Sequence, residues 1–161
     1  VLKGMLFNSY LFDDRLGFRI NYMQVVQNVP FVINSDLKIL SCQNSHLNSV
    51  ANSKKAKISF SSSSLMITAD HHNIHYTSDI GSAKDLKLFD DSKTDLLISE
   101  FAHIKAEDII NLLRDKSELK EVILTHIDPK NEAFVQKFDF HRLQETGKKI
   151  IFAYDGLKIT L

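Results

Sequence analysis

Four short apolar runs in the second half of the chain each end in or close to an aspartate, a glutamate or a histidine. The runs cover residues 76–81, 95–100, 122–127 and 150–156. A strand that is buried in a sheet is apolar along its length, and it can deliver a polar group where it reaches the rim. An aspartate and a histidine at two such strand ends can face one metal site.

The residues between these runs have the spacing of amphipathic helices, so the second half of the chain alternates helix and strand. Ser82 can cap one helix, and Glu107 and Asp108 lie near the start of another, where the helix dipole favours acidic residues. We expect helices over 82–89, 106–114 and 131–144, strands over 96–99, 122–125 and 150–153, and a hairpin turn at 155–156 leading into 157–161.

The first half of the chain is richer in extended segments than in helices. We expect extended segments over 18–26, 31–42, 57–60, 65–68 and 74–78, with a turn at 70–73. The four serines at 61–64 form either a hairpin loop or the polar edge of a strand. A β-rich first part followed by alternating strands and helices indicates a sheet covered by helices on one face, whose other apolar face must pair with something.

The composition is that of one globular domain, residues 1–161, with 43% hydrophobic and 25% charged residues. The 20 basic residues balance the 20 acidic ones, so no net charge draws the chain to nucleic acid, and we favour a small-molecule substrate. The single cysteine, Cys42, excludes an internal disulfide and is typical of the cytoplasm. No apolar run approaches the roughly 18 residues that span a bilayer, so we expect no membrane partner. Because the chain begins at Val1, we expect a piece of a longer protein.

The sequences of three segments, and their order along the chain, resemble the C-terminal half of a metallo-β-lactamase-fold hydrolase. The segments are TSDIG at 77–81, LTHIDP at 124–129 and AYDGL at 153–157. The family's His-x-His-x-Asp-His motif, which lies in its N-terminal half, is absent from this chain. The resemblance implies an α/β (α+β) fold class: half of an αββα sandwich, with a mixed sheet and helices on one face.

The resemblance also implies three metal ligands. Asp79 matches the bridging aspartate of the family, His126 its last histidine ligand, and His46 the lone histidine that follows an edge strand, while Gly81 would allow a tight turn. The intact protein would hold two zinc ions, although iron and manganese also suit nitrogen and oxygen ligands. The residues alone leave simpler alternatives open: a turn aspartate, a rim histidine and a surface histidine.

Glu100 and His103 follow the strand that borders the pocket in this family. A carboxylate beside an imidazole can hold its tautomer or tune a general acid, so we take this pair as the candidate catalytic or supporting residues. The alternative is a supporting carboxylate with an exposed histidine. The histidine-serine-threonine motif of the family's nucleases is absent, which argues against ribonuclease chemistry.

Three further histidines, His71, His72 and His75, cluster near the expected turn. They do not have the spacing of the family's metal motif, so we interpret them as part of a solvated turn, with a second metal site as the alternative.

The resulting hypothesis is part of a metal-dependent hydrolase that acts on an ester, lactone, thioester or phosphodiester and is inactive as a fragment. The alternative is a non-catalytic binding module that uses the uncovered sheet face. Under either hypothesis we expect the exposed apolar face to pack against the missing N-terminal half or against a second copy of the chain in a homodimer. A His-x-His-x-Asp-His motif encoded upstream would favour the enzyme, and its absence would favour the binding module.

Overall fold

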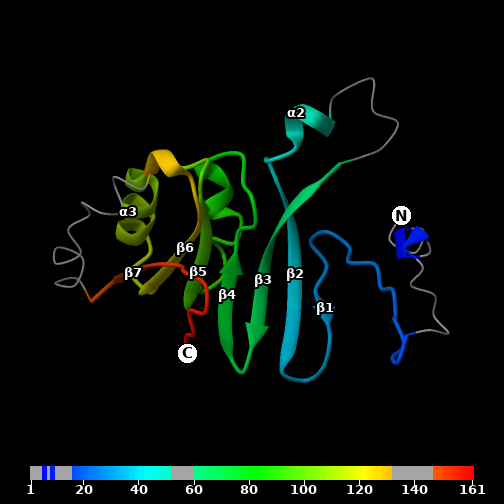
Figure 1. The fold of residues 1–161 in the computed structure, drawn as a ribbon. Coiled ribbons are helices and arrows are strands. Elements are labelled where there is room, and N and C mark those ends of the chain that lie inside the picture. The colour runs from blue at the N-terminus through cyan, green and yellow to red at the C-terminus, as the bar shows by residue number, and fades with distance from the viewer. Residues whose placement is uncertain (1–4, 7, 10–15, 52–59, 132–146) are drawn as a thin grey trace.

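One seven-stranded sheet organises the chain, with its strands in sequence order from β1 to β7 (Figure 1). The structure is a computed structural model that describes residues 5–6, 8–9, 16–51, 60–131 and 147–161. The strands are β1 Phe31–Val32, β2 Leu37–Asn44, β3 Ser62–Ala69, β4 His72–Tyr76, β5 Leu96–Phe101, β6 Glu121–Ile127 and β7 Lys149–Phe152. The helical elements are α2 Asn48–Ala51, the 3-10 helix η1 Ala83–Lys87 and α3 Ala106–Asp115.

The sheet is mixed, and the directions of its strands decide which strand ends lie together. Pairing is antiparallel from β1 to β4 and parallel from β4 to β7. Because β3 is antiparallel to both of its neighbours, β2 runs in the same direction as β4; Figure 1 shows β3 and β4 with opposed arrows. The carboxyl ends of β2, β4, β5 and β6 therefore lie at one edge of the sheet.

One face of the sheet is covered by helices, which we name the helix face. Its core is a single cluster of buried apolar side chains contributed by β5, β6 and β7 below and by η1 and α3 above. The cluster includes Leu97, Val122, Leu124 and Ile150 from the strands and Leu86, Ile109, Leu112 and Leu113 from the helices. The expected mixed sheet with helices on one face is confirmed.

The opposite face, which we name the open face, carries apolar side chains that stay partly exposed. Register places two rows of such residues across the strands, since residues directly opposite each other share a face. The apolar residues of the open face include Ile39, Leu65, Ile67, Ile74, Tyr76, Leu96, Ile98, Ile123 and Ile151. Tyr76 is 39% exposed, Leu96 and Ile123 are buried, and the others are half-buried.

The expected elements of the second half form with shifted ends. Strands β5, β6 and β7 and helix α3 occupy the expected places, whereas the helix after Ser82 is a 3-10 helix that ends at Lys87. The expected strand over 157–161 was wrong: the turn forms, with Leu157 N donating to Tyr154 O at 3.0 Å, but the residues after it do not pair. The helix expected over 131–144 lies, apart from Asn131, outside the described residues.

In the first half, the serine segment is resolved in favour of a strand, because residues 62–64 belong to β3 and pair with β2. Residues 18–26, expected to be extended, have no strand partner in the sheet, and several of their apolar side chains are exposed. The extended segment expected over 57–60 falls, except for Phe60, outside the described residues. In the described part of the chain, no helix has the length and apolar character needed to cross a membrane.

His75 is not part of a solvated turn. The turn holds the exposed His71, but His75 lies on the helix face of β4 and is only 2% exposed. Its ring meets Phe89 edge-to-face, with centroids 4.9 Å apart, and its Nε2 atom has no hydrogen-bond partner. Successive side chains of β4 point to opposite faces of the sheet, so the His75 side chain points into the core. It is therefore not available to the second metal site considered for His71, His72 and His75.

Burial and, to a smaller extent, the Lys116 cation lower the pKa of His75 to about 4, while the Asp90 carboxylate acts in the opposite direction. An unfolded histidine has a pKa of about 6.5, so between these values the unfolded chain binds a proton that the folded chain does not. The free energy of unfolding should therefore be highest above pH 6.5 and fall by up to about 1.4 kcal/mol per pH unit toward pH 4.

A His75→Leu variant, which removes the titrating group but keeps an apolar core, should lose this part of the slope in denaturant unfolding between pH 7 and pH 4. His71→Asn, at the exposed turn, should keep it. Identical slopes in the parent and His75→Leu would show that His75 is not buried as a neutral ring.

Candidate functional site

The residues selected from the sequence gather at the edge where β2, β4, β5 and β6 end. Asp79 comes three residues after β4, Glu100 lies near the end of β5, and His126 lies near the end of β6. His46 follows the end of β2 by two residues, and the parallel direction of β2 and β4 brings it to the same edge. Ligand sites of parallel sheets lie outside the carboxyl ends of their strands, as here.

Asp79 and His126 are in direct contact. His126 Nδ1 lies 3.0 Å from Asp79 Oδ1, and the two side chains are 56% and 48% exposed. In this metal-free contact Nδ1–H can donate to the carboxylate, and with Nδ1 deprotonated the same two facing atoms, a ring nitrogen and a carboxylate oxygen, can bind one ion. The expected convergence of these two side chains is present, and their role as metal ligands remains a prediction.

The backbone around this contact adopts conformations that ordinary residues avoid. Ser78 has a φ of 55° and His126 a φ of 45°. The pairing of β5 with β6 also shifts between Glu100 and Phe101, which leaves His126 as an extra residue in β6. Such bulges re-aim a side chain, and left-handed non-glycine residues cost about 1–3 kcal/mol each and cluster at functional sites.

Glu100 is buried (2% exposed) and oriented by the loop that follows β5. Its Oε2 accepts hydrogen bonds from the backbone N–H groups of Ala102 and His103. Its Oε1 lies 3.3 Å from His103 Nδ1 but makes no aligned hydrogen bond. A buried carboxylate oxygen that receives no hydrogen bond can accept one from a nearby N–H group, and the His103 ring lies beside it.

The His103 ring is near the rings of two other histidines at this edge, His46 and His126. Its ring centroid is 5.1 Å from that of His46 and 6.2 Å from that of His126. Its side chain is 42% exposed, so the ring is open to solvent on one side. Ring contacts thus connect His46, His103 and His126, with Asp79 beside His126 and Glu100 beside His103.

Asn44, at the end of β2, was not selected from the sequence, yet it connects two of the site's loops. Its Nδ2 donates to Asp79 O (3.1 Å) and Thr77 O (3.3 Å), while its Oδ1 accepts from His46 N (3.1 Å). The signal was available, since an asparagine at the end of a strand commonly binds the backbone two residues on. Its long-range bonds to the loop of Asp79 leave no trace in the local sequence.

The donor chemistry of this edge fits a zinc-type ion, which takes imidazole nitrogen and carboxylate oxygen. The set is incomplete: within the described ranges, no group of three or more His, Cys, Asp and Glu side chains is arranged to hold a metal ion. What the described residues offer is a contacting pair, Asp79 and His126, with two further imidazoles nearby.

Comparison with known proteins identifies the fold. No protein-family model and no curated protein matches the sequence. Among solved structures, the isothiocyanate hydrolase from Delia radicum gut bacteria matches 98% of this chain with a TM-score of 0.63 at 14% identity. The Zn²⁺-bound PqqB from Methylobacterium extorquens matches 98% with a TM-score of 0.56 at 14% identity. The metallo-β-lactamase fold protein YhfI from Bacillus subtilis matches 83% with a TM-score of 0.54 at 17% identity.

This chain has the metallo-β-lactamase fold. It spans only part of the proteins that it matches: 64% of the isothiocyanate hydrolase, 62% of PqqB and 52% of YhfI. At these identities the similarity establishes the fold, and function has to be argued from the site.

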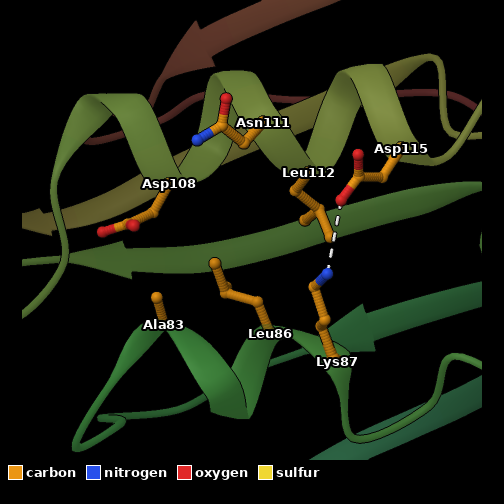
Figure 2. Close-up of a pocket in the computed structure, with 7 residues that line it drawn as sticks. All are labelled: Ala83, Leu86, Lys87, Asp108, Asn111, Leu112 and Asp115. Atoms are coloured by element: carbon orange, nitrogen blue, oxygen red, sulfur yellow. Dashed lines mark hydrogen bonds and ion pairs between the residues drawn. The ribbon is translucent and has the colours of Figure 1, made fainter.

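A groove lies away from these residues, between η1 and α3 (Figure 2). The groove has a volume of about 370 Å³ and is bridged by an ion pair between Lys87 Nζ and Asp115 Oδ2 at 3.3 Å. Its lining comes from the helices alone, as Figure 2 shows, and includes none of the histidines of the strand edge. The groove therefore adds no group to the candidate site.

Gly81 was expected to allow a tight turn, but its structural role is different. Its φ is not positive, so it does not serve as a left-handed turn residue. Instead, a Cβ atom there would lie 2.6 Å from Ser45 Oγ and 2.7 Å from the carbonyl carbon and oxygen of Ser45. The glycine lets the loop after Asp79 touch the backbone that leads into His46.

A Gly81→Ala substitution should therefore force these two loops apart and destabilise the fold by about 1–3 kcal/mol. Gly17→Ala is the matched control, because a Cβ atom at Gly17 meets nothing within 4 Å. Urea unfolding of both variants measures the difference. Equal stability of the two would show that the loops are not in contact.

Proposed function

We propose that this chain supplies part of the active site of a metal-dependent hydrolase with the metallo-β-lactamase fold. Asp79, His126 and His46 would be metal ligands, and the remaining ligands would come from a part of the fold outside these 161 residues. The observation that carries the proposal is the 3.0 Å contact between Asp79 and His126 at a bulged, left-handed position of β6. The substrate class we propose is an ester, lactone, thioester or phosphodiester.

A zinc-type ion held at this edge would supply a polarised substrate oxygen and a water ligand of lowered pKa. The chain's own residues do the positioning. Asp79 Oδ1 and His126 Nδ1 face each other at 3.0 Å, so with Nδ1 deprotonated both atoms would be placed to bind one ion. Glu100 is fixed by two backbone N–H groups and holds its Oε1 beside His103. The His103 ring can then move a proton on its solvent-exposed side.

The relatives in structure support this proposal without deciding it. One solved neighbour is an isothiocyanate hydrolase and another is Zn²⁺-bound, and both match 98% of this chain. The alternative of a non-catalytic binding module is favoured by one observation, the partly exposed apolar side chains of the open face.

The metal proposal is tested by zinc calorimetry on the 161-residue chain. We expect weak binding of one ion, because part of the ligand set is absent, and tight binding in any longer form of the protein. His126→Ala and Asp79→Asn should each weaken binding by more than the roughly 10–100-fold that an outer-shell partner is worth. His71→Ala, at the exposed turn, is the control and should leave binding unchanged. Equal affinity in all four proteins would refute the ligand assignment.

We further propose that the open face is covered in the working protein, by the rest of the sandwich or, in the isolated chain, by a second copy. Apolar surface of this extent is seldom left in water, and its burial contributes about 25 cal/mol per Å². The matched structures are longer than this chain, which is consistent with a further layer.

Light scattering on the 161-residue chain should give a dimer, and Tyr76→Lys on the open face should shift it toward monomer. Glu107→Lys, on the exposed side of α3, should have no effect. A stable monomer that fails to bind a dye specific for apolar surface would mean that the fold is complete without a partner.

A further inference from the structure

The carboxylate of Asp85 accepts four hydrogen bonds, although the residue lies outside every motif considered above. Asp85 is 5% exposed and belongs to η1. Its Oδ1 accepts from Ser45 N at 3.2 Å, and its Oδ2 accepts from Ser45 Oγ at 2.6 Å, Gly81 N at 2.9 Å and Ser82 N at 3.2 Å. Every one of these donors belongs to a loop at the candidate site.

We propose that Asp85 is a positioning residue: it holds the loop that carries His46 against the loop that carries Asp79 and so fixes the separation of these two side chains. Ser45 directly precedes His46, and Gly81 follows Asp79 by two residues. One carboxylate therefore bonds to both loops within two residues of the proposed ligands. Its consequence for metal affinity rests on the proposed function, whereas its consequence for loop geometry does not.

A helix cap alone does not account for these bonds. Asp108 occupies the equivalent third position of α3, and its Oδ2 accepts from Lys105 N at 2.9 Å, the ordinary capping bond. Asp85 makes the corresponding bond to Ser82 N, and it adds bonds to Ser45, which lies 40 residues earlier in the chain. The bond from Ser82 N already caps the helix, so the bonds from Ser45 act on the loop that carries His46.

The surrounding contacts make the arrangement specific. The missing side chain of Gly81 allows the backbones to meet, since a Cβ atom would lie 2.7 Å from the Ser45 carbonyl. On the other side, Asn44 binds both His46 N and Asp79 O. A buried carboxylate with four donors is held by charge-assisted bonds, which are about twice as strong as neutral ones. Partners of this kind that orient ligands are worth roughly 10–100-fold in metal affinity.

The test compares Asp85→Asn with Asp108→Asn in the 161-residue chain. Asparagine is isosteric, but its Nδ2 cannot accept, so the bonds from Ser45 and Gly81 are reduced. In the metal-free protein, Asp85→Asn should lose amide-exchange protection at Ser45 and Gly81 and the nuclear Overhauser contact between the His46 and His103 rings. Asp108→Asn should keep all three signals. Unchanged ring contact in Asp85→Asn would overturn the proposal.

Zinc affinity provides the second readout. Calorimetry should show a loss of roughly 10–100-fold for Asp85→Asn and no more than twofold for Asp108→Asn. Loss of exchange protection with unchanged ring contact and unchanged zinc affinity would make Asp85 a cap only and would overturn the positioning role. If the parent chain binds no zinc, the proposed function fails, and the ring contact alone then decides the role of Asp85.

A milder variant covers the case in which Asp85→Asn does not fold. Ser45→Ala removes only the 2.6 Å bond from Ser45 Oγ and leaves the cap of η1 intact. Circular dichroism should show a folded chain, and the ring contact and zinc affinity should change in the same direction as for Asp85→Asn, by a smaller factor. A folded Ser45→Ala protein with parental ring contact and affinity would also contradict the proposal.

Discussion

Four strands that end at one edge of a single sheet are the constraint on which the candidate site depends. The antiparallel β3 lets β2 run in the same direction as β4, and the parallel pairing from β4 onward brings the ends of β5 and β6 alongside. His46, Asp79, Glu100 and His126 are far apart in sequence, and they become neighbours only because each follows or ends one of these strands.

The helix layer gives this edge a rigid support. The apolar cluster between the strands and the helices is fully buried, so it can hold Ser78 and His126 in left-handed conformations that cost about 1–3 kcal/mol each. The loops at the edge are further fixed by polar side chains, Asn44 and Asp85, whose hydrogen bonds run between segments far apart in the chain. The opposite face of the sheet lacks such a layer within the described residues, which is where the account expects a partner.

The parts that could be predicted from the sequence are those governed by local pattern. Apolar runs and helical spacing predicted β5, β6, β7 and α3. Polar residues at the strand ends predicted that Asp79 and His126 are neighbours. What could not be predicted depends on contacts across the fold. The burial of His75 follows from its place in β4, and the contact of Gly81 with Ser45 follows from how two distant loops meet.

The central claim is that the side chains at this edge bind one cation together. It is tested most directly by ¹⁵N NMR of the histidine rings as Zn²⁺ is added to the 161-residue chain. We predict that the ring nitrogens of His126 and His46 change together along one binding curve, while those of the exposed His71 stay unchanged. Zinc-dependent changes at His71 and His72 without any at His126 would contradict it.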